Sequence, residues 1–188
     1  MVRIDVVVTR GGDGGETSLG DGARLRKDAP RIAAIGTVDE ANAAIGMLRL
    51  ATRDEPEVDA MLARIQNDMF DVGADLSVPG EGGDRLRLSD VPVSRLEAEV
   101  AAMNARLPKL TSFVLPGGRP GAAHAHMART VVRRAERDVV RLAAGQAVTP
   151  ALLRYLNRLS DHLFVLARVL NANGAEDVPW TPGANLGA

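Results

Sequence analysis

A glycine-rich segment near the start of the chain, Thr9 to Ser18 (TRGGDGGETS), has the composition of a phosphate-binding loop. Glycines adopt positive φ angles without steric cost, so successive backbone N–H groups can point into one concavity that binds phosphate oxygens. The segment is not a Walker A loop, because no G-x-x-x-x-G-K-[ST] sequence occurs in the chain. The helical pattern around it also argues against a Rossmann fingerprint. The alternative interpretation is a flexible loop that binds nothing.

Arginines gather in residues 128–137 (ARTVVRRAER), which we expect to be helical. Arg129, Arg133 and Glu136 are spaced by four and three residues and therefore share one helix face, with Arg137 at its border. Like charges one turn apart repel by roughly a few tenths of a kcal/mol, so an anion or a partner that compensates them is expected. Guanidinium groups bind phosphate oxygens through paired hydrogen bonds, which makes a polyphosphate a suitable ligand. A solvated face of arginine and glutamate is the alternative.

The sequence predicts no metal site and no conventional nucleophile. The chain has no Cys, and His124 and His126 point about 200° apart on a helix, so they cannot bind one ion together. No Gly-x-Ser-x-Gly elbow is present. Polar stripes along otherwise apolar helices predict a shared polar cleft or a subunit interface, with a plain solvent-facing surface as the alternative. These stripes include Asp39, Asn42, Asn157, Ser160, Asp161, Phe164 and Arg168.

The elements that must position these residues are helices. From Ile32 onward apolar side chains recur every three or four residues, and the last helix carries a seam of leucines at steps of four and three. Ser94 and Glu97 are predicted to form a capping box that opens the third helix, and Thr149 is predicted to cap the fifth. The predicted helices cover about residues 30–53, 56–76, a short stretch from Ser94 past Met103, 121–144 and 150–172.

Composition favours one helical domain. The chain has 188 residues, a net charge of −1 and only 3% aromatic residues, so its core is built from Ala, Leu and Val. The balanced charge argues against nucleic-acid binding, and no apolar run reaches the ~18 residues of a membrane span. We therefore expect a single cytoplasmic domain over residues 1–188. Its fold class is all-α, a five-helix up-and-down bundle (30–174) with an irregular Gly-rich tail (1–29) and a Pro/Gly-rich tail (175–188) draped over it.

Taken together, these residues resemble the PduO-type ATP:cob(I)alamin (corrinoid) adenosyltransferases. The family's motifs occur in order and span residues 9–161. Arg10 stands where Lys is usual. Gly11 and Gly14 stand where Thr and Lys are common, so we expect the loop to be more flexible before ATP binds. The matching blocks are Thr9, Arg10, Gly12, Asp13, Gly15 and Thr17; Lys27 and Asp28; Gly36 to Glu40 with Asn42; Ile65 to Leu76; Phe113 to Gly118; Ala128 to Arg137; and Tyr155 to Asp161.

The resemblance implies a homotrimer that binds ATP at each subunit interface, with Mg²⁺ on the phosphates. It implies that Co(I) of a corrinoid attacks C5′ of ATP, which forms adenosylcobalamin and releases triphosphate. Because the cobalt is itself the nucleophile, the protein needs to supply only position and charge. The resemblance assigns ATP contacts to Thr9, Arg10, Gly11, Gly12, Asp13, Gly15, Thr17, Ser18, Lys27, Arg133, Arg134, Ala135, Glu136, Arg137 and Asn157.

The resemblance also implies catalytic roles for Phe113, Arg129, Arg133, Asp39 and Asp161. Arg129 is expected to pair with Asp39 across the subunit boundary. Phe113 is expected to face the lower side of the corrin and displace the lower ligand of cobalt, which makes Co(II) easier to reduce. The alternative for Phe113 is a core residue that anchors its loop.

Expected partners are a corrinoid reductase and an adenosylcobalamin-dependent enzyme, both through transient contacts. Two other classes of function remain open at this point. An ATP-dependent phosphotransferase would release ADP, and the missing P-loop lysine argues against the usual design. A corrinoid carrier would bind adenosylcobalamin without making it, and the ATP-site residues would then be redundant.

Overall fold

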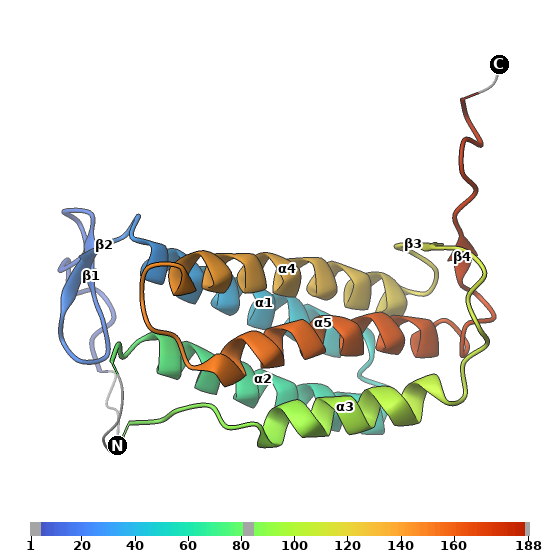
Figure 1. The fold of residues 1–188 in the computed structure, drawn as a ribbon, viewed down its shortest axis with the longest axis horizontal. Coiled ribbons are helices and arrows are strands. Elements are labelled where there is room, and N and C mark those ends of the chain that lie inside the picture. Colours follow the sequence, from blue (N-terminus) through green and yellow to red (C-terminus); the bar gives the residue numbers. More distant parts are fainter. Residues whose placement is uncertain (1–4, 81–84, 187–188) are drawn as a thin grey trace.

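The computed structural model describes residues 5–80 and 85–186. The described helices are α1 (Pro30–Ala51), α2 (Pro56–Leu76), α3 (Val91–Asn104), α4 (Pro120–Ala143) and α5 (Pro150–Leu170). Successive helices run up and down along one axis (Figure 1). Helix α1 packs against α2 and α4, and α5 packs against α4 and α3. The predicted all-α, five-helix up-and-down bundle is confirmed.

Every helix begins with a proline in its first turn, at the first or second helical position. Proline suits this position because its fixed φ is helical and its missing N–H would have no partner in the helix. The predicted capping box is wrong, because α3 already begins at Val91 and the amide of Ser94 donates to the carbonyl of Asp90 at 2.9 Å. Thr149 occupies the N-cap position of α5 as predicted, but its side chain forms no capping hydrogen bond. Its hydroxyl donates instead to Oδ1 of the buried Asp75, at 3.0 Å.

The core lies along the shared axis of the helices. The leucine seam of α5 is buried as predicted, from Leu152 to Leu166 without exposure and at Leu170 with 6%. Burial of one such side chain stabilises the fold by roughly 1.5–3 kcal/mol. Fully buried alanines occur along α1 and α4, which pack against each other, and such small side chains let backbones approach closely. These alanines are Ala34, Ala41, Ala122, Ala125, Ala128 and Ala135.

Short strands form at both ends of the bundle. Strands β1 (Glu16–Ser18) and β2 (Arg24–Arg26) make an antiparallel hairpin, while β3 (Val114–Leu115) pairs with β4 (Val178–Pro179). The prediction that both tails drape over the bundle is wrong. The hairpin stands beyond one end of the helices, and the C-terminal segment extends away from the other end (Figure 1). Each tail forms hydrogen bonds at its own end of the bundle instead of lying along the helices.

Within the described ranges, no helix is both long enough and apolar enough to span a bilayer.

Candidate active site

The glycine-rich loop is a tight turn that leads into β1. Its backbone turns through positive φ at Arg10 (57°) and Gly15 (84°). The amide of Asp13 donates to the carbonyl of Arg10, and the amide of Gly15 to that of Gly12, both at 3.2 Å. The amide of Lys27 donates to the carbonyl of Gly15 at 2.9 Å and closes the base of the turn. The structure therefore brings Lys27 against the turn formed by residues 9–18.

The side chain of Lys27 lies against the loop at Gly12. A Cβ on Gly12 would stand 3.0 Å from Nζ of Lys27 and 3.3 Å from the carbonyl oxygen of Glu16. Only glycine leaves this space free, so the ammonium group rests on the loop backbone. A cation beside a tightly turned glycine backbone is a suitable cradle for phosphate oxygens.

Arg24 on β2 contacts the glycine-rich loop and was not predicted as a site residue. One guanidinium nitrogen donates to the carbonyl of Gly11 at 2.8 Å, and the other donates to the hydroxyl of Ser18 at 3.3 Å. Residue 24 lies opposite residue 18 in the hairpin, which brings the two side chains to the same face. The only signal in the sequence is the short Arg-Leu-Arg alternation of residues 24–26.

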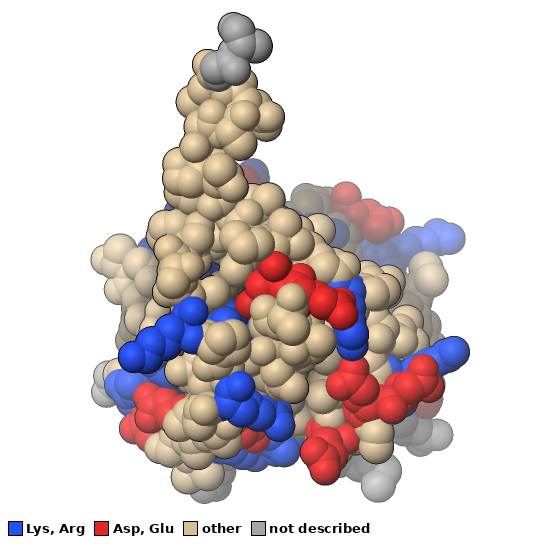
Figure 2. Space-filling view, turned by 90° about the vertical axis from the view of Figure 1, so that its right-hand side faces the viewer, with Lys and Arg blue, Asp and Glu red and all other residues tan. Residues whose placement is uncertain are grey.

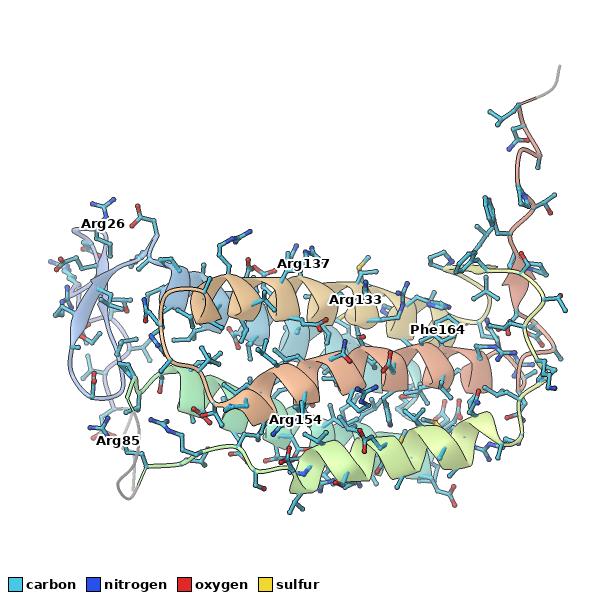
Figure 3. All side chains as sticks on the ribbon, viewed as in Figure 1. Arg26, Arg85, Arg133, Arg137, Arg154 and Phe164 are labelled. Atoms are coloured by element: carbon cyan, nitrogen blue, oxygen red, sulfur yellow. The ribbon has the colours of Figure 1, made fainter. Side chains whose placement is uncertain are left out.

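The arginine face of α4 combines exposed and buried guanidinium groups. Arg133 is exposed, and its carbonyl accepts a hydrogen bond from Arg137 at 3.1 Å. Figure 3 labels both side chains along α4. Arg129 is half-buried, and its Nε has no partner among the described residues. Burial lowers the pKa of Arg129, and the charge of Arg133 lowers it further. This helix face therefore concentrates positive charge that the chain itself does not fully compensate.

Neighbouring residues link α4 to α1 and α5. Arg134 forms an ion pair with Glu40 on α1. The amide of Asn157 on α5 donates to Oε1 of Glu136 at 3.0 Å, so these two predicted site residues are brought together. Ala135 is fully buried, so its methyl group belongs to the core and not to the arginine face.

Asp39 lies on α1, and Asp161 lies on α5 one turn after Asn157. Asp39 is an exposed residue of α1 at the rim of a groove of about 380 Å³ between α1 and α2. No ion pair joins Asp39 to Arg129 within the described part of the chain. Asp161 is exposed on α5 and accepts a hydrogen bond from Arg158 at 2.7 Å.

Phe113 lies at the far end of the bundle from the hairpin and is 78% exposed, so the interpretation of Phe113 as a core anchor is wrong. Its ring contacts Trp180, with ring centroids 6.2 Å apart and planes at 56°. Phe113, Trp180 and Phe164 line an open, mostly apolar depression of about 630 Å³. Figure 2 shows this end of the molecule, where the C-terminal segment rises as a column without acidic or basic side chains.

His126 on α4 was not predicted as a site residue, since the only role expected of a histidine here was metal binding. It is 2% exposed, and neither ring nitrogen has a partner among the described residues. Burial lowers its pKa, and the charge of Arg129 lowers it further. Its ring meets Phe164 edge-on, at a centroid distance of 6.2 Å. A buried neutral imidazole therefore lies between the arginine face and the aromatic depression.

These groups lie at different places along the bundle. The hairpin stands where α4 ends, Arg133 and Arg137 lie along α4, and Phe164 lies nearer the end that carries β3 (Figure 1 and Figure 3). Helix α4 has 24 residues and is about 36 Å long. The glycine-rich loop and Phe113 of one chain therefore lie at opposite ends of the bundle.

Comparisons with known proteins identify the family of the chain. The cobalamin adenosyltransferase family matches residues 7–170. A cobalamin adenosyltransferase of Cupriavidus metallidurans is 52% identical over 180 residues, which cover 95% of each chain. A corrinoid adenosyltransferase of Mycobacterium tuberculosis is 47% identical, covering 98% of this chain and 97% of the relative. A variant PduO-type ATP:corrinoid adenosyltransferase from Lactobacillus reuteri, solved with cobalamin and ATP, superposes with a TM-score of 0.87 at 32% identity, covering 94% of this chain and 97% of the other.

A helical bundle with a glycine-rich turn and an arginine face differs from the P-loop and Rossmann folds and is compatible with a nucleotide-binding enzyme. The chain belongs to the cobalamin adenosyltransferase family, in its PduO type, and is an ATP:corrinoid adenosyltransferase. The family predicted from the sequence motifs is confirmed.

Proposed function

We propose that this enzyme transfers the 5′-deoxyadenosyl group of ATP to Co(I) of a corrinoid and releases triphosphate. In this reaction the Co(I) electron pair forms the Co–C5′ bond while the C5′–O bond to the triphosphate breaks. The chain needs no nucleophile or general base of its own, because the reduced cobalt supplies the electron pair. The residues described above are proposed to place C5′ in line with cobalt and to stabilise the leaving group.

The observation that carries this proposal is the contact of Lys27 with Gly12. Glycine at position 12 lets the ammonium group rest on the turned backbone, and the two together form a compact cationic cradle. Triphosphate gains negative charge as the C5′–O bond breaks, so a fixed cation at this position favours the transition state over the ground state. Thr9, Arg10, Gly11, Asp13, Gly15, Thr17 and Ser18 are proposed to complete the phosphate contacts.

The arginine face of α4 is proposed to bind the same ATP from a neighbouring copy of the chain. The length of α4 separates the loop of one chain from its own Phe113. A closed ring of three copies would bring the loop of one subunit to the α4 helix of the next. Arg133, Arg134, Glu136, Arg137 and Asn157 are proposed to contact ATP there, and Asp161 to lie at the edge of the site.

The Nε atom of Arg129, which has no hydrogen-bond partner among the described residues, supports this assembly. A buried donor without a partner costs about 1–3 kcal/mol, so an acceptor from another copy would stabilise the assembly. Asp39 is an exposed carboxylate on α1, and we propose that it is this acceptor across the subunit boundary.

Phe113 is proposed to face the lower side of the corrin. Its exposure supports this role, because a ring that packs little against its own chain is free to contact a ligand. When Phe113 displaces the lower ligand of Co(II), electron density on the cobalt falls and reduction to Co(I) becomes easier. A corrinoid reductase and an adenosylcobalamin-dependent enzyme are proposed as transient partners before and after this chemistry.

Mg²⁺ is proposed to enter as part of the ATP complex. Across the described ranges, no three His, Asp or Glu side chains lie together as a metal site. Mg²⁺ is commonly held by substrate phosphates, waters and one or two carboxylates, so the ion is proposed to be bound mainly by ATP.

Product identification tests the proposed reaction. The enzyme is incubated with ATP, Mg²⁺ and chemically reduced cobalamin, while the corrin absorption spectrum and the phosphate products are followed. Adenosylcobalamin and triphosphate in equal amounts are expected. ADP as the product would indicate phosphoryl transfer instead, and binding of adenosylcobalamin without turnover would indicate a carrier.

A further inference from the structure

The aromatic pair of Phe113 and Trp180 is held by backbone contacts rather than by burial. Phe113 is 78% exposed and Trp180 is 44% exposed. The amide of Trp180 donates to the carbonyl of Phe113 at 2.7 Å, and the hydroxyl of Ser112 donates to the carbonyl of Trp180 at 2.7 Å. The place of the Phe113 ring therefore depends on what holds these two segments at the end of the bundle.

A buried ion pair holds both segments. Nε of Arg168, near the end of α5, donates to Oδ2 of Asp177 at 2.7 Å, while a terminal nitrogen donates to the carbonyl of Pro108 at 2.8 Å. The side chains of Arg168 and Asp177 are only 5% and 7% exposed. Pro108 leads into the Phe113 segment and Asp177 leads into Trp180, so one guanidinium group ties both segments to α5.

Asn171 ties the turn after Phe113 to the same place. Its side chain is 1% exposed, its Oδ1 accepts from the amide of Arg119 at 2.9 Å, and its Nδ2 donates to the carbonyl of Gly117 at 3.2 Å. The turn fits because Gly118 has φ +91° and no side chain. A Cβ on Gly118 would stand 2.2 Å from Oδ1 of Asn171.

We propose that Arg168, Asp177 and Asn171 form a clamp that positions Phe113 for its work on the corrin. The inference rests on the proposed function, in which Phe113 displaces the lower ligand of Co(II). The three residues do not line the depression, so they act through Phe113 and are positioning residues. A misplacement of about 1 Å costs roughly a hundredfold in rate when a reaction depends on exact contact. A buried ion pair suits this task because it specifies one arrangement, even where an apolar pair would be equally stable.

Trp180 reports the state of the clamp independently of activity. It is the only tryptophan of the chain, so intrinsic tryptophan fluorescence comes from this site alone. Asp177→Asn should increase the quenching of Trp180 by acrylamide and shift its emission to longer wavelength. Asp90→Asn is the matched control, because Asp90 pairs with Arg154 in an exposed ion pair between α3 and α5. The control should leave Trp180 unchanged.

Kinetics then separate positioning from general stability. With Co(II) reduced in the site, Asp177→Asn should lose between about tenfold and about a hundredfold in kcat. With preformed Co(I) the loss should be smaller, and KM for ATP should stay within about twofold. Arg168→Lys is a milder second variant, since it keeps the charge but loses the fork that reaches both Asp177 and Pro108. Arg168→Lys should show the same pattern with a smaller loss of kcat, and it replaces Asp177→Asn as the test variant if Asp177→Asn does not fold.

The outcomes distinguish this inference from the proposed function. If the unmodified enzyme does not form adenosylcobalamin and triphosphate, the proposed function fails, while the fluorescence result still tests the clamp. If the unmodified enzyme is active and both clamp variants behave like Asp90→Asn, the clamp is overturned. Equal losses with Co(II) and Co(I), together with unchanged Trp180 quenching, also overturn it.

Discussion

The ammonium nitrogen of Lys27 rests against Gly12, where a Cβ would stand only 3.0 Å away. The contact joins the end of the β1–β2 hairpin to the turn that precedes it. The loop therefore depends both on the Lys27 side chain and on the absence of a side chain at Gly12. Because the nearest neighbour is the flexible end of a lysine, and the carbonyl of Glu16 lies 3.3 Å from the same position, a methyl group at position 12 would displace the ammonium with only a small shift of the loop.

Gly12→Ala should therefore weaken ATP binding at little cost in stability. Loss of one charge-assisted contact is worth about 1.5–3 kcal/mol, so KM for ATP should rise at least about tenfold. Gly14→Ala is the control, since no atom lies within 4 Å of its Cβ position and it does not have a positive φ. Steady-state kinetics at varied ATP concentration check this. Equal KM values for the two variants would remove Lys27 and Gly12 from the phosphate cradle.

Arg133→Ala should also raise KM for ATP, by tenfold to more than a hundredfold, if its exposed guanidinium binds triphosphate (about 1.5–3 kcal/mol). Arg53→Ala is the control, because Arg53 is an exposed arginine just past the end of α1 and is not among the residues proposed to contact ATP. Its effect should stay within about 0.5 kcal/mol of stability, without a change in kinetics. Unchanged ATP kinetics in a folded Arg133→Ala enzyme would mean that Arg133 is an ordinary solvated residue.

Asp39→Asn should weaken both assembly and turnover, although Asp39 need not touch ATP. Removal of one member of a partly buried ion pair leaves the other charge stranded, at a cost of about 3–5 kcal/mol when the pair is buried. Analytical ultracentrifugation should show a trimer for the unmodified enzyme and a concentration-dependent loss of trimer for the variant. Asp54→Asn, at an exposed and distant ion pair with Arg53, is the control. A fully active monomer at micromolar concentration would contradict the proposal.

Phe113→Ala should keep near-native thermal stability, because the ring is 78% exposed. A buried phenylalanine would instead cost about 3–5 kcal/mol when truncated. Most activity should be lost when Co(II) is reduced in the site, and less when preformed Co(I) is supplied. Differential scanning calorimetry and the two assays together check this. The same loss with both cobalt states would indicate that Phe113 does not act on the lower ligand.

His126 should make the fold sensitive to acid. Burial and the charge of Arg129 lower its pKa, against a smaller opposite effect of Asp177, so the folded protein resists its protonation. The unfolded chain binds this proton near pH 6.5. As the pH falls from this value toward the lower pKa of the folded state, the free energy of unfolding therefore decreases. Urea unfolding of the unmodified enzyme and of His126→Asn, between pH 7.5 and about pH 5, should give a steeper loss for the unmodified enzyme. Parallel curves would contradict this.

The local elements of the fold could be predicted from neighbouring residues. A proline at each helix start and apolar residues at steps of three and four are local signals, and the α5 leucine seam is buried where they place it. The family motifs likewise located the glycine-rich loop, the α4 arginines and Phe113 along the chain. The sequence by itself thus determined the helices, the fold class and the family.

Only the tertiary structure decided how these parts are placed. The exposure of Phe113, the contact of Lys27 with Gly12, the orphaned Nε of Arg129 and the buried pair of Arg168 with Asp177 each depend on packing or on the path of the chain between elements. In the sequence Arg168 is one more polar residue of a helical stripe. Its neighbours in the chain do not distinguish it from the solvent-exposed Arg154. Its partner Pro108 lies 60 residues away in the chain. The folded bundle brings them together, because a buried guanidinium must find its acceptors wherever the chain path places them.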